Sequence, residues 1–393
     1  MKNRDLASEA AALQPKLVKW RRDLHSIPEL RMETPLTEAY IAERLREIGF
    51  ENIRTGVGGH GITADLKGPL PGPCVAIRAD CDGLPIREET GLHFASKNGN
   101  MHACGHDAHT ATVLGAATLL YKLKDQLKGS VRFIFQPFEE GGGGARLMIA
   151  DGALEQVDEI IGMHTGNIMG DEFRSGDLVY TEKYASSNIW AFRAVFRGKG
   201  AHVCKPKDAV DPISMAAAAT LRIKSEVATR SEGCHNVIAA VTVFNAGTRN
   251  NIIPEECFVE GSVRAFDPGL FDEIKRQVTD IINSSASGSG GRADIFTTID
   301  MKSICCDPTV RDGFLSSAAE ILPSERIKKL SEPIYMGEDF AMYSEKIPGF
   351  YFYLCSKPDG KCYPHHHPKF DIDEKTLSLG AELFAGYVLK RLG

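Results

Sequence analysis

Short apolar runs alternate with amphipathic stretches over the first half of the chain, which is the pattern of alternating strands and helices. The amphipathic stretches predict helices at residues 6–27, 34–49, 106–124 and 145–150. The apolar runs predict strands that are buried on both faces, at residues 61–67, 74–80, 131–136 and 158–163. This alternation predicts an α/β fold with a largely parallel sheet and right-handed crossovers.

The pattern changes near residue 186 and returns to the first type after residue 302. Between these points the expected order is β-α-β-β-α-β, with strands at 188–197, 236–244, 256–266 and 293–301 and helices at 211–229 and 268–284. This order is typical of a ferredoxin-like α+β domain. We therefore expect a domain at residues 186–302 inserted into a first domain formed by residues 1–185 and 303–393. The last part of that first domain should hold helices at 311–321, 338–346 and 374–392 and a strand at 350–354.

Potential ligands follow three of the apolar strands. They are Asp80 and Asp82, Glu139 and Glu140, and His164. Functional sites of parallel sheets lie at the carboxyl ends of the strands. A single acid at a strand end is often only a helix cap or a solvated loop residue, but three strand ends together favour a site.

The stretch at residues 101–110 carries three histidines, Cys104 and an aspartate. Zinc binds thiolate, imidazole and carboxylate groups, usually four of them. Cys104 and His106 can reach one metal if the chain turns at Gly105, because glycine adopts turn conformations readily. A reduced cysteine in a histidine-rich loop is the alternative. The run of histidines at 365–367 also follows a strand, and alone it could be a solvated loop.

The adjacent residues Glu139 and Glu140 can have two different functions. Neighbouring side chains in an extended segment point to opposite sides, so one carboxylate can bind metal while the other faces water. Bound zinc lowers the pKa of water to about 7, and a nearby carboxylate can then act as general base. Two surface glutamates on a glycine-rich loop are the alternative.

Composition mainly excludes certain partners and compartments. With 393 residues, 43% hydrophobic and 25% charged, the chain is an ordinary globular protein. A net charge of −6 gives no reason to expect nucleic acid or an anionic membrane as partner, and no apolar run approaches the length of a membrane span. The ten cysteines show no disulfide spacing, which favours reduced thiols in the cytoplasm.

Nearly the whole chain resembles the dinuclear-metal aminoacylase and carboxypeptidase family. That family includes hippurate hydrolases, plant auxin–amino-acid conjugate hydrolases, p-aminobenzoyl-glutamate hydrolase and glutamate carboxypeptidases. The matching motifs are WRRDLH at 20–25, PE at 28–29, RADCDGLP at 78–85, CGHD at 104–107, FQPFEEG at 135–141, MH at 163–164, GKGAH at 198–202, NIIP at 251–254, GEDF at 337–340 and HHPKF at 366–370. In carrying a cysteine at position 104, the chain resembles the branch of the family that contains the hippurate and auxin-conjugate hydrolases.

The resemblance implies a zinc-peptidase-like catalytic domain with two divalent ions, zinc or manganese. The implied metal ligands are Cys104, His106, Glu140, His164 and His366. Glu139 would be the general base and Asp82 an acid that orients a ligand. The insert would be a lid and dimerisation domain of a homodimer. Its His202 would contribute to catalysis, and its Asn251 and Arg264 would bind the free α-carboxylate of the substrate. Gly337, in the later GEDF motif, would also contact the substrate.

The resemblance therefore implies a metal-dependent hydrolase that cuts the amide bond of N-acyl or N-aroyl amino acids. Two alternatives stay open, a dipeptidase or carboxypeptidase of the same fold and a non-catalytic metal-binding homologue. The segment at 203–207, VCKPK, departs from the small residues and histidine that close relatives carry there, which puts the shape of the substrate pocket in doubt.

Overall fold

The computed structural model describes residues 3–167, 170, 172–227, 237–330 and 334–393. The chain forms two compact units. Unit 1 holds Met1–Ala185, Ile304–Ile334 and Glu338–Gly393, and unit 2 holds Ser186–Ser303 and Tyr335–Gly337. The insert therefore ends at residue 303 rather than 302, and a short later segment with Gly337 joins it.

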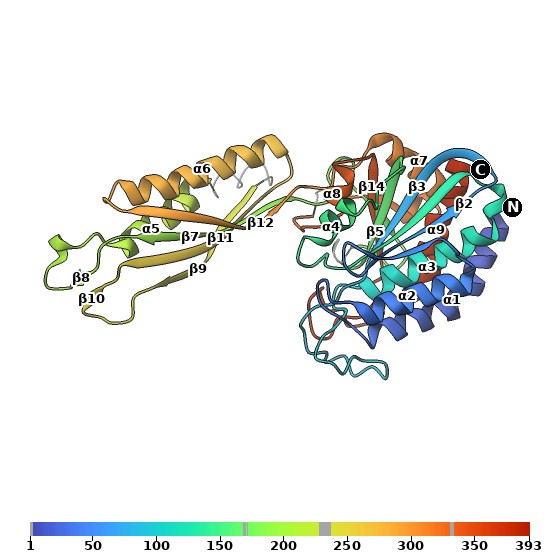
Figure 1. Ribbon diagram of the computed structural model, residues 1–393, viewed down its shortest axis with the longest axis horizontal. Coiled ribbons are helices and arrows are strands. Elements are labelled where there is room, and N and C mark those ends of the chain that lie inside the picture. Colours follow the sequence, from blue (N-terminus) through green and yellow to red (C-terminus); the bar gives the residue numbers. More distant parts are fainter. Residues whose placement is uncertain (1–2, 168–169, 171, 228–236, 331–333) are drawn as a thin grey trace. The chain divides into compact units, whose positions relative to one another are not determined.

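Unit 1 is built on an eight-stranded sheet (Figure 1). Its order is β1 (Ile53–Val57), β2 (Gly61–Lys67), β4 (Lys128–Gln136), β3 (Leu70–Asp80), β5 (Glu159–Gly166), β14 (Gly349–Cys355), β6 (Leu178–Tyr180) and β13 (Ile327–Lys329). The central strands β4, β3, β5 and β14 are parallel, as predicted, and β1, β2 and β6 form antiparallel pairs towards the edges. The sheet is thus mixed but mostly parallel at its centre.

Helices of unit 1 bury the sheet. They are α1 (Asn3–His25), α2 (Pro35–Ile48), α3 (His106–Lys122), α4 (Gly144–Ala150), α7 (Pro308–Ala318), α8 (Ala341–Ser344) and α9 (Thr376–Leu392). Helices α1, α3 and α9 pack against one another, and α3 and α9 contact β3. Almost every residue of α3 is buried, so this helix is apolar on nearly all sides. Helix α2 starts at a proline and ends at Gly49, whose φ of 117° only glycine adopts readily.

Two predicted elements of unit 1 differ from the structure. The helix expected at 338–346 is limited to α8, because the side chains of Glu338 and Asp339 bind Arg78 instead of facing solvent on a helix. His164 lies inside β5 rather than after it. The strands β1, β6 and β13 were not predicted.

Unit 2 has the predicted ferredoxin-like topology. Its elements are β7 (Asn188–Arg197), α5 (Pro212–Arg222), β9 (Val237–Ala246), β11 (Glu256–Ala265), α6 (Pro268–Ser287) and β12 (Arg292–Met301). The antiparallel sheet has the order β12-β7-β11-β9, and both helices pack on one face over a core that includes Trp190, Phe196 and Phe271. Helix α5 passes into a π-helical turn at Ile223–Val227. The predicted end of this helix at 229 and the start of the next strand at 236 lie outside the described residues.

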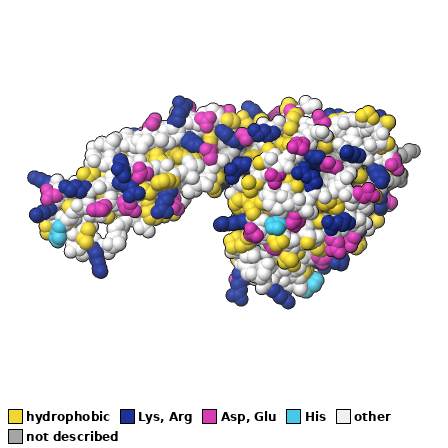
Figure 2. All heavy atoms as spheres, viewed as in Figure 1, with side chains coloured by type: hydrophobic (Ala, Val, Ile, Leu, Met, Phe, Trp, Pro, Cys, Tyr) yellow, Lys and Arg dark blue, Asp and Glu magenta, His cyan; other side chains and the backbone are white. Residues whose placement is uncertain are grey.

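A short ribbon continues unit 2 beyond β7 and β11. It pairs β8 (Ala201–His202) with β10 (Ile252–Ile253). Among the described residues, no helix combines the length and apolarity that crossing a membrane requires. Basic and acidic side chains are interspersed on the face shown in Figure 2, without a large patch of one sign.

Candidate metal centre

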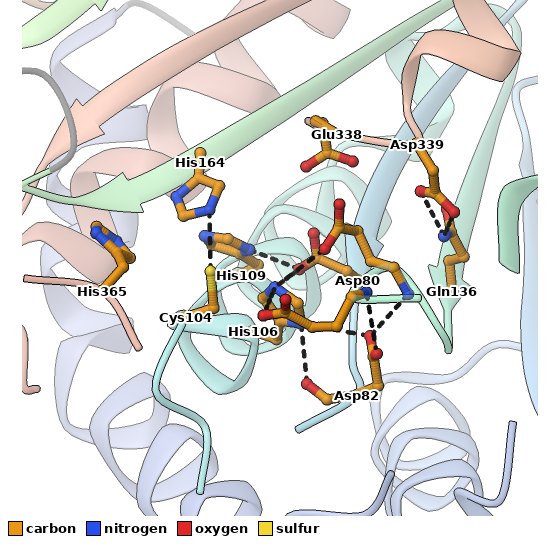
Figure 3. A network of polar contacts seen from close by, with 12 residues as sticks. Asp80, Asp82, Cys104, His106, His109, Gln136, His164, Glu338, Asp339 and His365 are labelled. Atoms are coloured by element: carbon orange, nitrogen blue, oxygen red, sulfur yellow. Dashed lines mark hydrogen bonds and ion pairs between the residues drawn. The ribbon is translucent and has the colours of Figure 1, made fainter. Parts of the chain in front are cut away.

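Donor atoms from four separate segments of unit 1 converge at one place. Figure 3 shows Cys104, His106 and His164 of this cluster. Cys104 and His106 stand at the start of α3, Glu140 follows β4, His164 lies in β5 and His366 lies in the loop before α9. The Cys104 Sγ is 3.4 Å from His164 Nε2, and Glu140 Oε1 is 3.3 Å from His366 Nε2 and 3.9 Å from His106 Nε2. The parallel sheet explains this meeting, because the ends of β4 and β5 face the same edge.

These residues fit a metal site. His106 Nε2 is buried and has no hydrogen-bond partner, while its Nδ1 donates to the carbonyl oxygen of Asp82 at 2.9 Å. His164 Nδ1 donates to the Thr165 carbonyl at 2.7 Å, which leaves the lone pair of its Nε2 directed at Cys104. Each ring is therefore held in the tautomer that a metal requires. Thiolate, imidazole and carboxylate donors together suit zinc.

The charges around the site favour cations. Burial lowers the pKa of His106, but the carboxylates of Asp80, Asp82 and Glu140 outweigh burial and raise it to about 10. Burial raises the pKa of the Cys104 thiol, and the two glutamates raise it further. Groups that bind their protons this tightly lie in a strongly negative electrostatic potential. The same potential favours a divalent cation.

Glu139 lies beside the donor cluster, with its Oε2 4.0 Å from His106 Nε2. Its side chain is buried, and burial first and the neighbouring Glu338 second raise its pKa well above the usual range. Its backbone N–H donates to Asp82 Oδ1 at 3.0 Å, and the N–H of Glu140 donates to Asp82 Oδ2 at 3.3 Å. Asp82 thus holds both glutamates in place while its carbonyl orients His106.

The sequence motifs contained residues of this site whose roles we did not predict. His109 Nδ1 binds Asp80 Oδ1 at 2.6 Å, and its Nε2 accepts from the Thr165 N–H at 2.9 Å. It therefore connects the ends of β3 and β5 behind the metal ligands. Its spacing of three residues from His106 on α3 was the available signal, because such residues share a helix face.

Arg78 is the second unpredicted residue. It is buried and binds Asp80 at 2.7 Å, Asp339 at 2.8 Å and Glu338 at 3.0 Å. Gln136 also donates to Asp339. One arginine thus holds three acids near the candidate metal ligands, and Figure 3 shows the contact between Gln136 and Asp339 beside the site. An arginine–carboxylate pair separated by 261 residues leaves no local pattern in a sequence.

The other histidines of the two histidine-rich stretches lie outside the donor cluster. Both ring nitrogens of His102 are buried without a partner, and burial lowers its pKa to about 4. His365 binds the Thr165 carbonyl oxygen at 3.0 Å, and burial likewise lowers its pKa to about 4. His367 stacks on Tyr363. Among the run at 365–367, only His366 belongs to a described donor group.

The residues expected to act from the insert, and Gly337, lie at two different places in unit 2. His202 and Asn251 lie together on the β8–β10 ribbon, where the Val203 N–H donates to the Asn251 carbonyl at 3.1 Å. Arg264 lies at the opposite end of β11 and donates to the Tyr335 carbonyl. Gly337 packs against Ile189 at the same end.

Comparisons with known proteins identify the family of the chain. Residues 76–390 match the model of the peptidase family M20/M25/M40. The chain is 36% identical over 375 residues to the N-acetylcysteine deacetylase of Bacillus subtilis (strain 168), covering 95% of this chain and 96% of the relative. It is 32% identical over 388 residues to the IAA-amino acid hydrolase ILR1-like 5 of Arabidopsis thaliana, covering 96% and 86%.

A solved structure is similar throughout. The Bacillus subtilis YXEP protein, a dinuclear metal binding peptidase, superposes with a TM-score of 0.83 at 34% identity and covers 97% of this chain and 99% of that chain. The matched residues include all of the donor cluster. The chain belongs to the peptidase family M20/M25/M40 of metal-dependent amidohydrolases and peptidases.

Proposed function

We propose that this protein hydrolyses the amide bond of N-acyl or N-aroyl amino acids, releasing a carboxylic acid and a free amino acid. The observation that carries the proposal is Glu139, a buried carboxylate beside the donor cluster with its backbone fixed by Asp82. A protein that only stored metal would not need such a base. The deacetylase and conjugate-hydrolase activities named for the relatives support an acylated amino acid as substrate.

In this proposal Cys104, His106, Glu140, His164 and His366 hold two divalent ions, zinc or manganese. Such ions polarise a carbonyl and make water acidic at neutral pH. Glu139 takes a proton from the attacking water and delivers it to the leaving amine. Its burial beside the donor cluster keeps this carboxylate out of bulk water, where it can act on a water molecule at the metals.

His202 would stabilise the negative oxygen that develops on the scissile carbonyl. Its Nδ1 accepts a hydrogen bond from the Cys204 N–H at 3.2 Å. The neutral ring therefore carries its proton on Nε2, where it can be donated to an oxyanion. Its exposed position on the β8–β10 ribbon leaves this donor available to a substrate.

Arg264 would bind the free α-carboxylate of the substrate. In the described part of the chain, no acid pairs with Arg264, whereas Arg193 and Arg197 on the same sheet pair with Glu260 and Asp294. Burial lowers the pKa of Arg264, so the charge is partly desolvated without compensation. A substrate carboxylate would match its planar donors.

Arg264 and the ribbon residues cannot serve one substrate from the same lid. Arg264 is eight residues along β11 from Glu256, which is about 27 Å of strand, and the ribbon lies beyond Glu256. This changes the expectation that Asn251 and Arg264 of one chain hold the same carboxylate. We therefore include a homodimer in the proposal, in which one copy supplies Arg264 and the other supplies His202 and Asn251.

The test is a panel of N-acetyl, N-benzoyl and p-aminobenzoyl amino acids together with dipeptides, assayed with metal-loaded and chelator-treated protein. We expect hydrolysis of acylated amino acids that disappears on chelation and returns with zinc or manganese. Preference for dipeptides would instead indicate a peptidase. Absence of turnover in protein that binds metal would indicate a non-catalytic homologue.

A further inference from the structure

Arg21, in the N-terminal helix α1, connects two segments that carry donor atoms of the metal centre. The residue is 1% exposed. Its Nε donates to Asp107 Oδ2 at 2.8 Å, its Nη2 to Asp371 Oδ1 at 2.9 Å and its Nη1 to Glu374 Oε1 at 3.2 Å. All the nitrogens of one guanidinium are therefore used, each on a separate acid.

These acids are neighbours of metal-ligand candidates. Asp107 directly follows His106 in the first turn of α3. Asp371 lies five residues after His366, in the loop that leads to α9. The guanidinium therefore fixes the spacing between the two segments that present His106 and His366.

Other contacts hold the same two segments together, so Arg21 acts on a joint that already exists. The His366 N–H donates to the Ala103 carbonyl oxygen at 2.9 Å. The ring of Phe370 is buried against the turn at Gly105, where an added Cβ would lie 3.8 Å from it. This packing sets the segments in contact, and the charged contacts of Arg21 determine their angle.

His25 strengthens the same anchor from the next turn of α1. Its Nδ1 lies 2.7 Å from Asp107 Oδ2, and its Nε2 lies 3.2 Å from Glu88 Oε1. Residues four apart share a helix face, so Arg21 and His25 approach Asp107 together. Asp107 is thereby held from α1 by two side chains, and it belongs to none of the donor groups found among the described residues.

We propose that Arg21 is a positioning residue of the metal centre, which sets the separation of His106 and His366 and makes the N-terminal helix part of the site. This inference rests on the proposed two-metal function. Partners beyond the ligands themselves typically change metal affinity ten- to a hundredfold when they are lost. Lysine cannot replace Arg21, because it offers one point charge instead of a planar fork.

The chain supplies a matched control in Arg22. It stands beside Arg21 on α1 and binds the same Glu374, at 3.0 and 2.6 Å, but it donates no hydrogen bond to Asp107 or Asp371. Arg22→Lys therefore changes the shape of a charged group on the same helix and leaves the contacts of Arg21 with Asp107 and Asp371 in place. Asp371→Asn removes the negative charge from the contact on the side of His366 and leaves the buried pair of Arg21 and Asp107 in place.

The experiment titrates metal-free protein with Zn²⁺ by calorimetry and records melting temperatures before metal is added. We expect Arg21→Lys and Asp371→Asn to bind one of the two ions about ten- to a hundredfold more weakly, and Arg22→Lys to bind both as wild type does. If Arg21→Lys does not fold, Asp371→Asn alone decides. Wild-type affinities for both ions in the variants would overturn the role of Arg21. A wild-type protein that binds no metal would overturn the proposed function as well.

Discussion

Asp82 accepts a hydrogen bond from the backbone N–H of Glu139 at 3.0 Å, so the proposed base is held through its main chain and not through its carboxylate. The second oxygen of Asp82 accepts from the next N–H, at 3.3 Å. One aspartate thus sets the direction of two successive side chains that serve different purposes.

Exchanging each of these glutamates for glutamine should separate base from ligand. Glu139→Gln should lose about 10²- to 10⁴-fold in kcat, because general base catalysis contributes that much, and it should keep its metal. Glu140→Gln should bind metal more weakly, since its oxygen lies 3.3 Å from His366 Nε2. Turnover and metal content of each purified variant are the measurements. The opposite assignment would hold if Glu139→Gln lost metal and Glu140→Gln kept it.

Arg264→Met should lose about ten- to a hundredfold in kcat/KM, mainly through KM, because a hydrogen bond to a charged group contributes about 1.5–3 kcal/mol. The substrates to compare are an N-acyl amino acid and its carboxamide, which lacks the charge. Wild type should prefer the acid, and the variant should treat both alike. Arg193→Met is the control, because Arg193 already pairs with Glu260 on the same sheet. An unchanged preference for the acid in Arg264→Met would exclude the contact.

Strands with long apolar runs were predictable from sequence, and short edge strands were not. The bounds of β2 and β7 agree with the predicted ranges, because burial imposes a continuous or alternating pattern over seven to ten residues. Strands β6 and β13 have three residues each, too few to show a period. They exist because β14 offers β6 a partner, which is a tertiary effect.

The candidate ligands were predictable because strand ends and a Cys-Gly-His turn are local features. The supporting network was not, since Arg78 meets Asp339 only after the sheet has formed. The expected pairing of Asn251 with Arg264 rested on the family resemblance. Within one chain β11 extends between these two residues and carries Arg264 to the far end of the sheet, which the sequence spacing does not reveal.

Glu382 on α9 should make stability depend on pH. Burial raises the pKa of Glu382 from 4.5 to about 6. Because the folded state holds the proton more tightly, the stability that this group contributes at low pH is lost as pH rises from about 4.5 to about 6. The full shift would correspond to about 2 kcal/mol, and partial exposure reduces it to about 1 kcal/mol.

Glu382→Gln, which stays neutral, should therefore raise the melting temperature at pH 8 by about 1–2 °C. At pH 4 both proteins carry a neutral side chain there, so the difference should vanish, and this measurement is the internal control. Equal melting temperatures at both pH values would show that Glu382 is solvated in the folded protein.

Mixing two inactive variants should reveal whether His202 acts on the partner's substrate. His202→Ala should lose about a hundredfold in kcat, as loss of one oxyanion donor does, and Glu139→Gln should be nearly inactive. If His202 acts across the dimer, a mixed dimer of the two variants contains one site with an intact Glu139 from one copy and an intact His202 from the other. Equal mixing with full exchange of subunits should then restore about a quarter of wild-type activity, since half of the dimers are mixed and each has one working site. If His202 acts on its own chain, every site in the mixture lacks one group, and mixing restores nothing. Exchange of subunits is measured separately, by capturing untagged wild-type chains through affinity-tagged wild-type chains after the same mixing. Activity that stays at the sum of the separate variants, with exchange demonstrated, would therefore exclude the shared site.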